Sequence, residues 1–251
     1  MDWSTKISVF FNTMKNEYWQ ELFLTGLLNT VKIAVIGLIL GIVVGVLIAI
    51  VKVAPKYKRI MRILDKIFTV YVAIFRGTPM VVQLLLTYYV LLPIMGFSAV
   101  DPLVVGYIVF GLNSGAYVSE IMRGGINSVD AGQMEAGRAV GLGYGTTMLK
   151  IVIPQAIKNI VPTLGNEFIT LIKETSVVSF ITVYDLYTVM RAIAGKNYDS
   201  MIPYICMALV YIVLVLLITL LVKGVEKLFA KSDRKTTSLV QKKKRKAKVE
   251  K

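Results

Sequence analysis

The chain has 251 residues, of which 56% are hydrophobic, and it carries a formal net charge of +14 at pH 7. Soluble globular domains rarely combine so apolar a composition with so large a charge, which indicates an integral membrane protein. The chain has no histidine and a single cysteine, Cys206, so it contains no internal disulfide and lacks the commonest metal ligand and general base. We therefore expect no catalytic residue and no metal site.

Five segments have the length and hydropathy of membrane-spanning helices, each close to the roughly 20 residues that a spanning helix needs. Four of them contain long runs without an acidic or basic residue, whereas the fourth in chain order is interrupted by charges. We predict an all-α membrane domain over residues 1–231 and a basic tail over residues 232–251. The predicted spans cover residues of about 24–52, 62–92, 102–123, 155–184 and 202–222.

The first predicted span carries Gly37, Gly41 and Gly45 at intervals of four residues. This spacing places small residues along one helix face and lets a neighbouring backbone approach closely. We expect close packing inside the chain, with a specific dimer contact as the alternative. Trp19, ahead of this span, is most simply an anchor at the membrane interface.

The second predicted span is interrupted by the sequence Arg-Gly-Thr-Pro at residues 76–79. Proline frees a carbonyl one turn back and glycine loosens the helix, so a bend or break is expected here. Transporters place ligand contacts beside such breaks, which makes Arg76 a candidate substrate contact. Arg76 could instead pair with Glu174 or extend toward the membrane surface.

The third predicted span ends with Glu120 and Arg123, which are spaced to face each other on one side of a helix. A structural ion pair is the simplest interpretation. A gate, or a connection to the loop that follows, is the alternative.

Residues 124–150 are too long and too charged to be a simple connection, so this segment should have its own structure. Asp130, followed by Gln133, has the form of a helix N-cap with a reciprocal partner, and Gly141 stands where a left-handed residue would end the helix. We predict a short cytoplasmic helix at about 131–140. Its many alanines and glycines suggest docking into a partner's groove, with a partnerless surface helix as the alternative.

Lys173 and Glu174 lie midway through the fourth predicted span, where a charge facing lipid would cost at least about 2.5 to 3.5 kcal/mol. They should therefore face protein or water. A zwitterionic amino acid offers a carboxylate for the lysine and an ammonium for the acid, so we expect a substrate contact, with an ion pair between helices as the alternative. Weaker candidates for the same site are Asn166, Thr175 and Ser176.

The distribution of lysine and arginine predicts the orientation in the membrane. Six basic residues lie from Lys52 to Lys66, in and next to the loop between the first and second spans, whereas residues 91–102 have none, so the first loop is cytoplasmic and the second is outside. Alternation then places the N-terminus outside and the basic tail in the cytoplasm. The basic run at 242–246 suits anionic lipid or a nucleic acid; directly after a span, lipid is favoured, and we expect no nucleic acid partner.

The segment around residue 135 resembles the EAA loop of ABC importer permeases, a pattern of Glu-Ala-Ala, Gly, Ile and Leu-Pro at fixed spacing. Gly137 stands in place of the alanine at the third position of Glu-Ala-Ala, and Ile153 in place of the leucine. Further motifs resemble the polar amino acid uptake subfamily. They are Arg76 to Pro79 with Gln83-Leu84, Ala116 to Ile126, Gly132-Gln133, and Leu171 to Ser176.

The resemblance covers most of the chain, from roughly Thr25 to Leu221. It implies the five-helix core of the type I ABC importer permease fold in a bacterial inner membrane. The implied partners are a cytoplasmic ABC ATPase dimer, a second permease subunit that is another copy or a related chain, and an extracytoplasmic amino acid-binding protein. The residues expected to contact the ATPase are Glu135, Ala136, Gly137 and Gly141.

Two other functions compete with an ATP-driven amino acid importer. A secondary transporter or channel acting without ATP would be favoured by paired, inverted halves, and no such pairing is evident. A membrane enzyme would need a nucleophile with its base, or a metal cluster. The chain also has no Gly-x4-Gly-Lys-Ser/Thr phosphate loop, so we expect ATP to be bound by a partner subunit and no cofactor to be bound by this chain.

Overall fold

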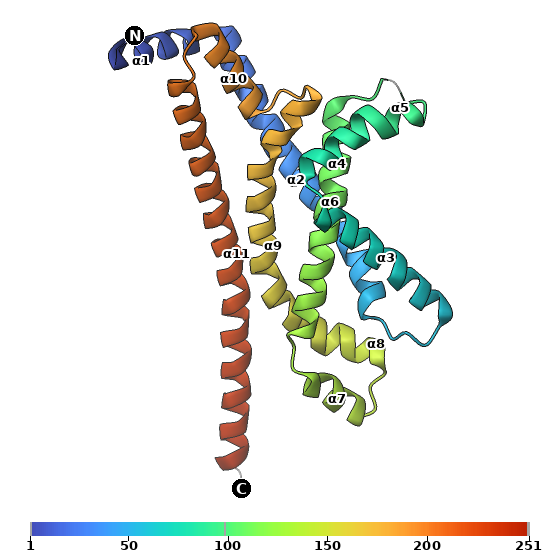
Figure 1. Ribbon diagram of the computed structural model, residues 1–251. Coiled ribbons are helices and arrows are strands. Elements are labelled where there is room, and N and C mark those ends of the chain that lie inside the picture. Colours follow the sequence, from blue (N-terminus) through green and yellow to red (C-terminus); the bar gives the residue numbers. More distant parts are fainter. Residues whose placement is uncertain (1, 98, 250–251) are drawn as a thin grey trace. The chain divides into compact units, whose positions relative to one another are not determined.

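The computed structural model describes residues 2–97 and 99–249, with the side chains of the last helix described as far as Leu228. All regular elements among these residues are helices, which confirms the predicted all-α class (Figure 1). In chain order they are α1 (Trp3–Met14), α2 (Glu17–Val53), α3 (Arg59–Gly77), α4 (Met80–Leu86), η1 (Thr87–Leu91), α5 (Leu92–Ile94), α6 (Pro102–Asn127), α7 (Ala131–Ala139), α8 (Tyr144–Thr147), η2 (Met148–Val152), α9 (Ile153–Glu174), η3 (Thr175–Ile181), α10 (Leu186–Asn197) and α11 (Met201–Val249).

Three of the described helices are long and apolar enough to cross a membrane alone, namely α2, α6 and the Met201–Leu228 part of α11. Two bent pairs qualify only together: α3 with Met80–Ile94, bent by 108°, and Tyr144–Ile181 with α10, bent by 57°. The count of described spans reaches five if each bent pair is one span. The segment 62–92 is therefore not one straight helix.

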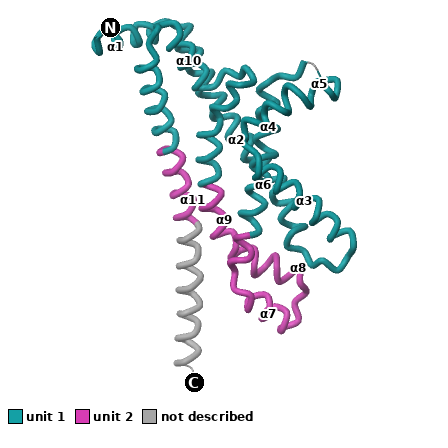
Figure 2. Tube along the Cα trace, viewed as in Figure 1, with its two compact units in different colours: residues 1–123, 166–215 teal, residues 124–165, 216–251 magenta. Residues whose placement is uncertain are grey.

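The chain divides into two compact units, each described here by itself (Figure 2). Unit 1 contains Met1–Arg123 and Asn166–Val215, and unit 2 contains Gly124–Gly165 and Leu216–Lys251. The helices α6, α9 and α11 contribute residues to both units.

Within unit 1, Gly37, Gly41 and Gly45 of α2 are sites of close contact with α6. A Cβ atom on Gly41 would lie 2.6 Å from the Cβ of Ser114, and one on Gly45 would be equally crowded. The contact is reciprocal, because a Cβ on Gly111 of α6 would lie 2.6 Å from the Cβ of Leu40. The glycine stripe thus packs inside the chain, as expected, and brings two helix backbones together.

The break between α3 and α4 is stabilised by one side-chain amide. Pro79 has no N–H to donate to the Phe75 carbonyl one turn back. The Nε2 of Gln83 donates to that carbonyl at 2.8 Å and to the Thr78 carbonyl at 3.0 Å. Its Oε1 accepts from Asn113 Nδ2 of α6 at 2.9 Å. The expected break is therefore present, and its exposed backbone groups have partners.

A second packed region of unit 1 lies where α1, α2, α10 and α11 meet. Phe10 and Trp19 belong to one buried cluster with residues of α10 and with Ile202 of α11. Trp19 is only 9% exposed, and Lys196 lies over its ring, with Nζ 4.9 Å from the centroid. The prediction that Trp19 is an interface anchor is wrong, because α1 and α10, which were not predicted as separate helices, cover it.

Contacts between the end of α6 and the first half of α9 help to hold unit 2 together. Gly125 of α6 faces Ile160 of α9, and a Cβ there would overlap the isoleucine side chain. The Asn159 Nδ2 atom donates to Ser128 Oγ at 2.8 Å. The side chains from residue 229 on, including the predicted basic tail at 232–251, lie outside the described residues.

Candidate functional site

The first candidate region is the hairpin formed by α7 and α8 in unit 2. The helix α7 spans Ala131–Ala139, against the predicted 131–140. Asp130 caps it by accepting from the Gly132 N–H at 2.7 Å. Gln133 does not supply the reciprocal arm of that cap, since its Oε1 accepts from Gln155 Nε2 of α9 at 3.1 Å.

The C-terminal end of α7 is fixed by glycine. Gly141 has a φ of +88°, the left-handed conformation expected from the sequence. Its N–H donates to the Arg138 carbonyl at 3.0 Å, and the Leu142 N–H donates to the Gly137 carbonyl at 3.1 Å. These two bonds form a Schellman motif, so the direction of the chain after α7 is set by local chemistry.

The small residues of α7 face two ways. Gly137 is buried, and a Cβ on it would lie 3.0 Å from Thr147 Oγ1 and closer still to the threonine methyl. This explains why glycine occupies the position at which the EAA pattern has its last alanine. Glu135, Ala136 and Ala139 are exposed. The hairpin therefore presents a thin, small-residue surface outward while it packs through Gly137.

The second candidate region is the end of α9 in unit 1. Lys173 and Glu174 were expected midway along a helix, but Glu174 ends α9, and the chain continues as the 3-10 helix η3. Lys173 and Asn166 are exposed, and Glu174 is half-buried. Lys173 and Asn166 are seven residues apart, so they lie on nearly the same face of α9. The structure thus brings Lys173 and Asn166 onto one open side of the helix, whereas Glu174 lies about 100° round the axis from the lysine.

The two remaining candidates, Thr175 and Ser176, donate hydrogen bonds to backbone carbonyls. Thr175 is fully buried, and its Oγ1 donates to the Ile172 carbonyl at 2.8 Å. Ser176 is half-buried, and its Oγ donates to the Lys173 carbonyl at 3.4 Å. These hydroxyls satisfy carbonyls where the helix tightens, so they support the corner that carries the lysine and the acid.

Sequence reasoning did not select Glu167 as a site residue. Its side chain is 9% exposed and its Oε1 accepts from Ser114 Oγ of α6 at 3.0 Å. Glu167 lies seven residues before Glu174, so the two carboxylates share a face of α9. Its position inside a predicted span was visible in the sequence, but its partner depends on the packing of α6 against α9.

Arg76 contacts an aromatic ring of α6 within unit 1. The guanidinium of Arg76 lies over the ring of Tyr117, with Cζ 5.3 Å from the centroid, and Arg76 is exposed. A cation over an aromatic face is stabilised without an anionic partner. Of its predicted alternatives, pairing with Glu174 is not among the ion pairs found in the described residues.

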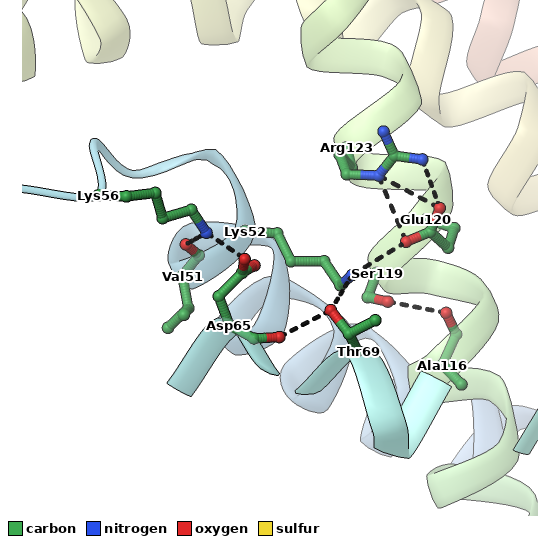
Figure 3. Close-up of polar contacts among 9 residues, drawn as sticks. All are labelled: Val51, Lys52, Lys56, Asp65, Thr69, Ala116, Ser119, Glu120 and Arg123. Carbon is green, nitrogen blue, oxygen red and sulfur yellow. Dashed lines mark hydrogen bonds and ion pairs between the residues drawn. The ribbon is translucent and has the colours of Figure 1, made fainter. Parts of the chain in front are cut away.

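A polar network joins α2, α3 and α6 (Figure 3). Arg123 Nη2 and Glu120 Oε2 lie 2.6 Å apart, which is the ion pair expected from their spacing. Lys52 Nζ lies 3.6 Å from Glu120 Oε1 and donates to Thr69 Oγ1 at 3.4 Å. In the same network Lys56 Nζ lies 2.7 Å from Asp65 Oδ1. These contacts hold the basic first loop against the end of the third predicted span.

Among the residues that the structure describes, no group of three or more histidine, cysteine or acidic side chains is placed to hold a metal ion. The chemistry that the described candidates offer is recognition of charged and polar groups by Lys173, by the half-buried acid of α9 and by amide and hydroxyl groups around them.

Comparison with known proteins finds the relatives of this chain among membrane transport proteins. Residues 37–231 match the family described as binding-protein-dependent transport system inner membrane component. The arginine transport system permease protein ArtQ of Bacillus subtilis (strain 168) is 39% identical over 210 residues, covering 84% of this chain and 93% of that protein. A putative glutamine transport system permease protein GlnP of Rickettsia conorii (strain ATCC VR-613 / Malish 7) is 38% identical over 202 residues, covering 80% and 90%.

Two solved structures have the same fold as this chain. A chain in the crystal structure of an amino acid ABC transporter with histidines aligns with a TM-score of 0.76 and 37% identity, covering 87% of this chain and 97% of that chain. A chain of an inward facing MetNI methionine ABC transporter aligns with a TM-score of 0.70 at 18% identity, covering 85% and 99%, and at that identity it supports the fold alone.

Proposed function

Because this chain belongs to the family of binding-protein-dependent transport system inner membrane components, we propose that its α7 hairpin docks an ATPase and that the open face of α9 contacts the transported solute. The chain is a multi-pass membrane protein and the permease subunit of an amino acid ABC transporter. Its named relatives include arginine, glutamine and cystine permeases, so the proposed substrate is a polar amino acid.

The observation that carries the docking proposal is the exposed surface of α7. Ala136 and Ala139 face outward from a helix whose cap, end and inner face are all fixed by contacts within unit 2. A rigid helix with little side-chain bulk can enter a groove at small entropic cost. The helices α6 and α9 lead from this unit into unit 1, so movement of the docked hairpin would reach the spans through continuous helix.

A photocrosslinking experiment tests the docking. Cys206→Ser combined with Ala136→Cys gives a chain with one thiol, which a maleimide-benzophenone reagent labels. Illumination of the assembled transporter should then give an adduct of permease and ATPase subunit. The matched control is Tyr57→Cys in the same background, since Tyr57 is 90% exposed and lies in the predicted cytoplasmic loop between α2 and α3. An absent adduct, or equal adducts from both sites, would contradict docking through α7.

The solute contact rests on the charges of α9. Lys173 supplies an ammonium for the carboxylate of an amino acid, and Glu174 supplies a carboxylate for its ammonium. Asn166 lies on the same face as the lysine and adds an amide. Arg76, beside the helix break, is a further contact in this proposal, whereas Thr175 and Ser176 support the corner through their bonds to backbone carbonyls.

Replacement of the lysine tests the solute site. Lys173→Met should strongly reduce ATP-driven uptake of polar amino acids in proteoliposomes, or alter the preference among them, while the ATPase stays bound. Lys15→Met removes the same charge from an exposed position at the end of α1 and should leave uptake unchanged. Unaltered uptake and preference in Lys173→Met would overturn the proposed contact.

The family supports a wider assembly. The chain acts with a binding protein and an ATPase, and we propose two permease subunits around one path, two ATPase subunits in the cytoplasm, and an outside N-terminus with a cytoplasmic C-terminus. The alternative, a transporter or channel that acts without ATP, is not favoured, because the family and the named relatives are ABC permeases.

A further inference from the structure

The helix α1 has three chemically different faces, and one of them holds it to unit 1. Lys6, Phe10 and Thr13 lie within about 60° of one another around the helix axis. Lys6 Nζ is 3.0 Å from Asp199 Oδ1, and its hydrogen bond holds the pKa of that carboxyl below its usual range. Thr13 Oγ1 donates to Asn197 Oδ1 at 2.9 Å, and Phe10 is buried.

A second face is apolar and exposed. Trp3, Ile7 and Phe11 follow one another at intervals of four residues and lie within about 80° around the helix. Their exposed fractions are 55%, 41% and 57%. The third face is polar and exposed over about 100°. Its residues are Ser4, Thr5, Ser8, Asn12 and Lys15.

The position of α1 is set by its attachment next to a membrane-spanning segment. Asp199, which pairs with Lys6, lies two residues before the first residue of α11, and Figure 1 shows α1 beside the start of α11. From Met201 to Val222 this helix has no charged residue. That length corresponds to about 33 Å of helix, close to the ~30 Å thickness of the hydrocarbon region. The N-terminal helix therefore lies level with one edge of the apolar part of α11.

We propose that α1 lies in the membrane–water interface, with the face of Trp3, Ile7 and Phe11 inserted into a phospholipid bilayer. Tryptophan and phenylalanine at the edge of an apolar span, opposite serine and asparagine, form the side-chain pattern of an interfacial helix. A protein partner fits less well, because a stable protein interface needs about 800 Å² on each side. A stripe of three side chains on a helix about 18 Å long is too narrow for that.

Tryptophan fluorescence tests the proposal, because the chain has only two tryptophans, Trp3 and Trp19. Trp19→Phe leaves Trp3 as the sole reporter in the full chain, reconstituted in vesicles of phosphatidylcholine and phosphatidylglycerol. Phosphatidylcholine brominated near the headgroup end of its acyl chains should remove about half or more of the Trp3 emission, as insertion by ~5–10 Å requires. Aqueous iodide should have little effect.

The matched control moves the reporter to the polar face of the same helix. Asn12 is exposed and lies about 180° from Trp3 around the helix axis. A chain with Trp3→Phe, Trp19→Phe and Asn12→Trp should show the reverse, with strong iodide quenching and weak quenching by brominated lipid.

Strong iodide quenching of Trp3 without lipid quenching would overturn the proposal, and would instead indicate a face open to water or to a soluble partner. Because Trp19 is buried, Trp19→Phe could unfold the region. The Trp3 signal is then obtained by subtracting the emission of Trp3→Phe from that of the unaltered chain, so the proposal stays testable.

Discussion

Two regions of this permease are rich in small residues, and they use them in opposite ways. In α2 the three glycines spaced by four residues face α6, and any side chain on Gly41 or Gly45 would collide with its neighbour. In α7 only Gly137 faces inward, while Ala136 and Ala139 point away from the unit. The same kind of residue therefore makes a closed contact in one helix and an open surface in the other.

Small residues in a sequence have to be interpreted by the kind of helix that carries them. Here the glycines spaced by four along a long apolar helix mark a contact within the chain, because another spanning helix lies against them. Alanines and glycines on a short helix between spans have fewer neighbours within the chain, so a small residue there can stay exposed. The exposed Ala136 and Ala139 leave a thin surface open, which suggests a partner, and three predictions test this contrast.

The largest effect is expected from Gly41→Leu. The Cβ alone would lie 2.6 Å from Ser114, which also bonds the buried Glu167, so α2 and α6 would have to separate. Overpacking of a tight contact costs about 1–3 kcal/mol, and more where backbone must move. We expect a lower thermal unfolding midpoint in detergent and little folded protein in membranes.

Gly224→Leu is the matched control for Gly41→Leu, because a Cβ on Gly224 has no neighbour within 4 Å. It should leave the unfolding midpoint nearly unchanged. If Gly41→Leu unfolds at the same temperature as the control, the contact between α2 and α6 is looser than described.

A smaller effect, limited to the coupling of ATP hydrolysis to uptake, is expected when a larger side chain is placed on α7. Ala136→Leu should leave the chain folded but reduce ATP-driven uptake, because the larger side chain meets the ATPase. Gly137→Leu should also reduce uptake, but for a different reason, since its side chain collides with Thr147 and opens the hairpin. Trypsin cleavage after Arg138 separates the two, because only the opened hairpin should be cut faster than the unaltered one.

The comparison between Ala136→Leu and Gly137→Leu can fail in two informative ways. Normal uptake by Ala136→Leu would remove the argument that the exposed face of α7 meets a partner. Equal trypsin sensitivity of the two variants would show that Gly137 is not the inward contact.

Much of the fold could be predicted because its signals are local. The break after Arg76 follows from glycine and proline, and the end of α7 follows from Gly141, since each depends on a few neighbouring residues. Apolar segments of about 20 residues similarly report spans by composition alone. For such features the residues that cause the structure are also the residues at which it occurs, so they can be found in the sequence.

Other features depend on which helices meet, and the sequence does not reveal this. Trp19 was predicted as an interface anchor because aromatic residues gather there, but α10 folds back over it. The helix α1 was missed because its apolar stripe covers only one of three faces. The bond between Glu167 and Ser114 requires the register of α6 against α9. Lys173 and Glu174 were placed mid-helix because the change to a 3-10 helix has no strong sequence signal.

The smallest effect is expected at the end of α7, where glycine is favoured by the backbone conformation and not by a lack of space for a side chain. Gly141 has φ +88°, and a Cβ there would meet no atom within 4 Å, so Gly141→Ala tests backbone strain alone. The left-handed conformation costs an alanine about 1–2 kcal/mol, whereas asparagine tolerates it better. Hydrogen exchange of the Leu142 amide, which bonds the Gly137 carbonyl, should therefore become about fivefold faster or more in Gly141→Ala and change less in Gly141→Asn. Unchanged exchange in the alanine variant would mean that contacts with η2, rather than the glycine end, hold the hairpin in shape.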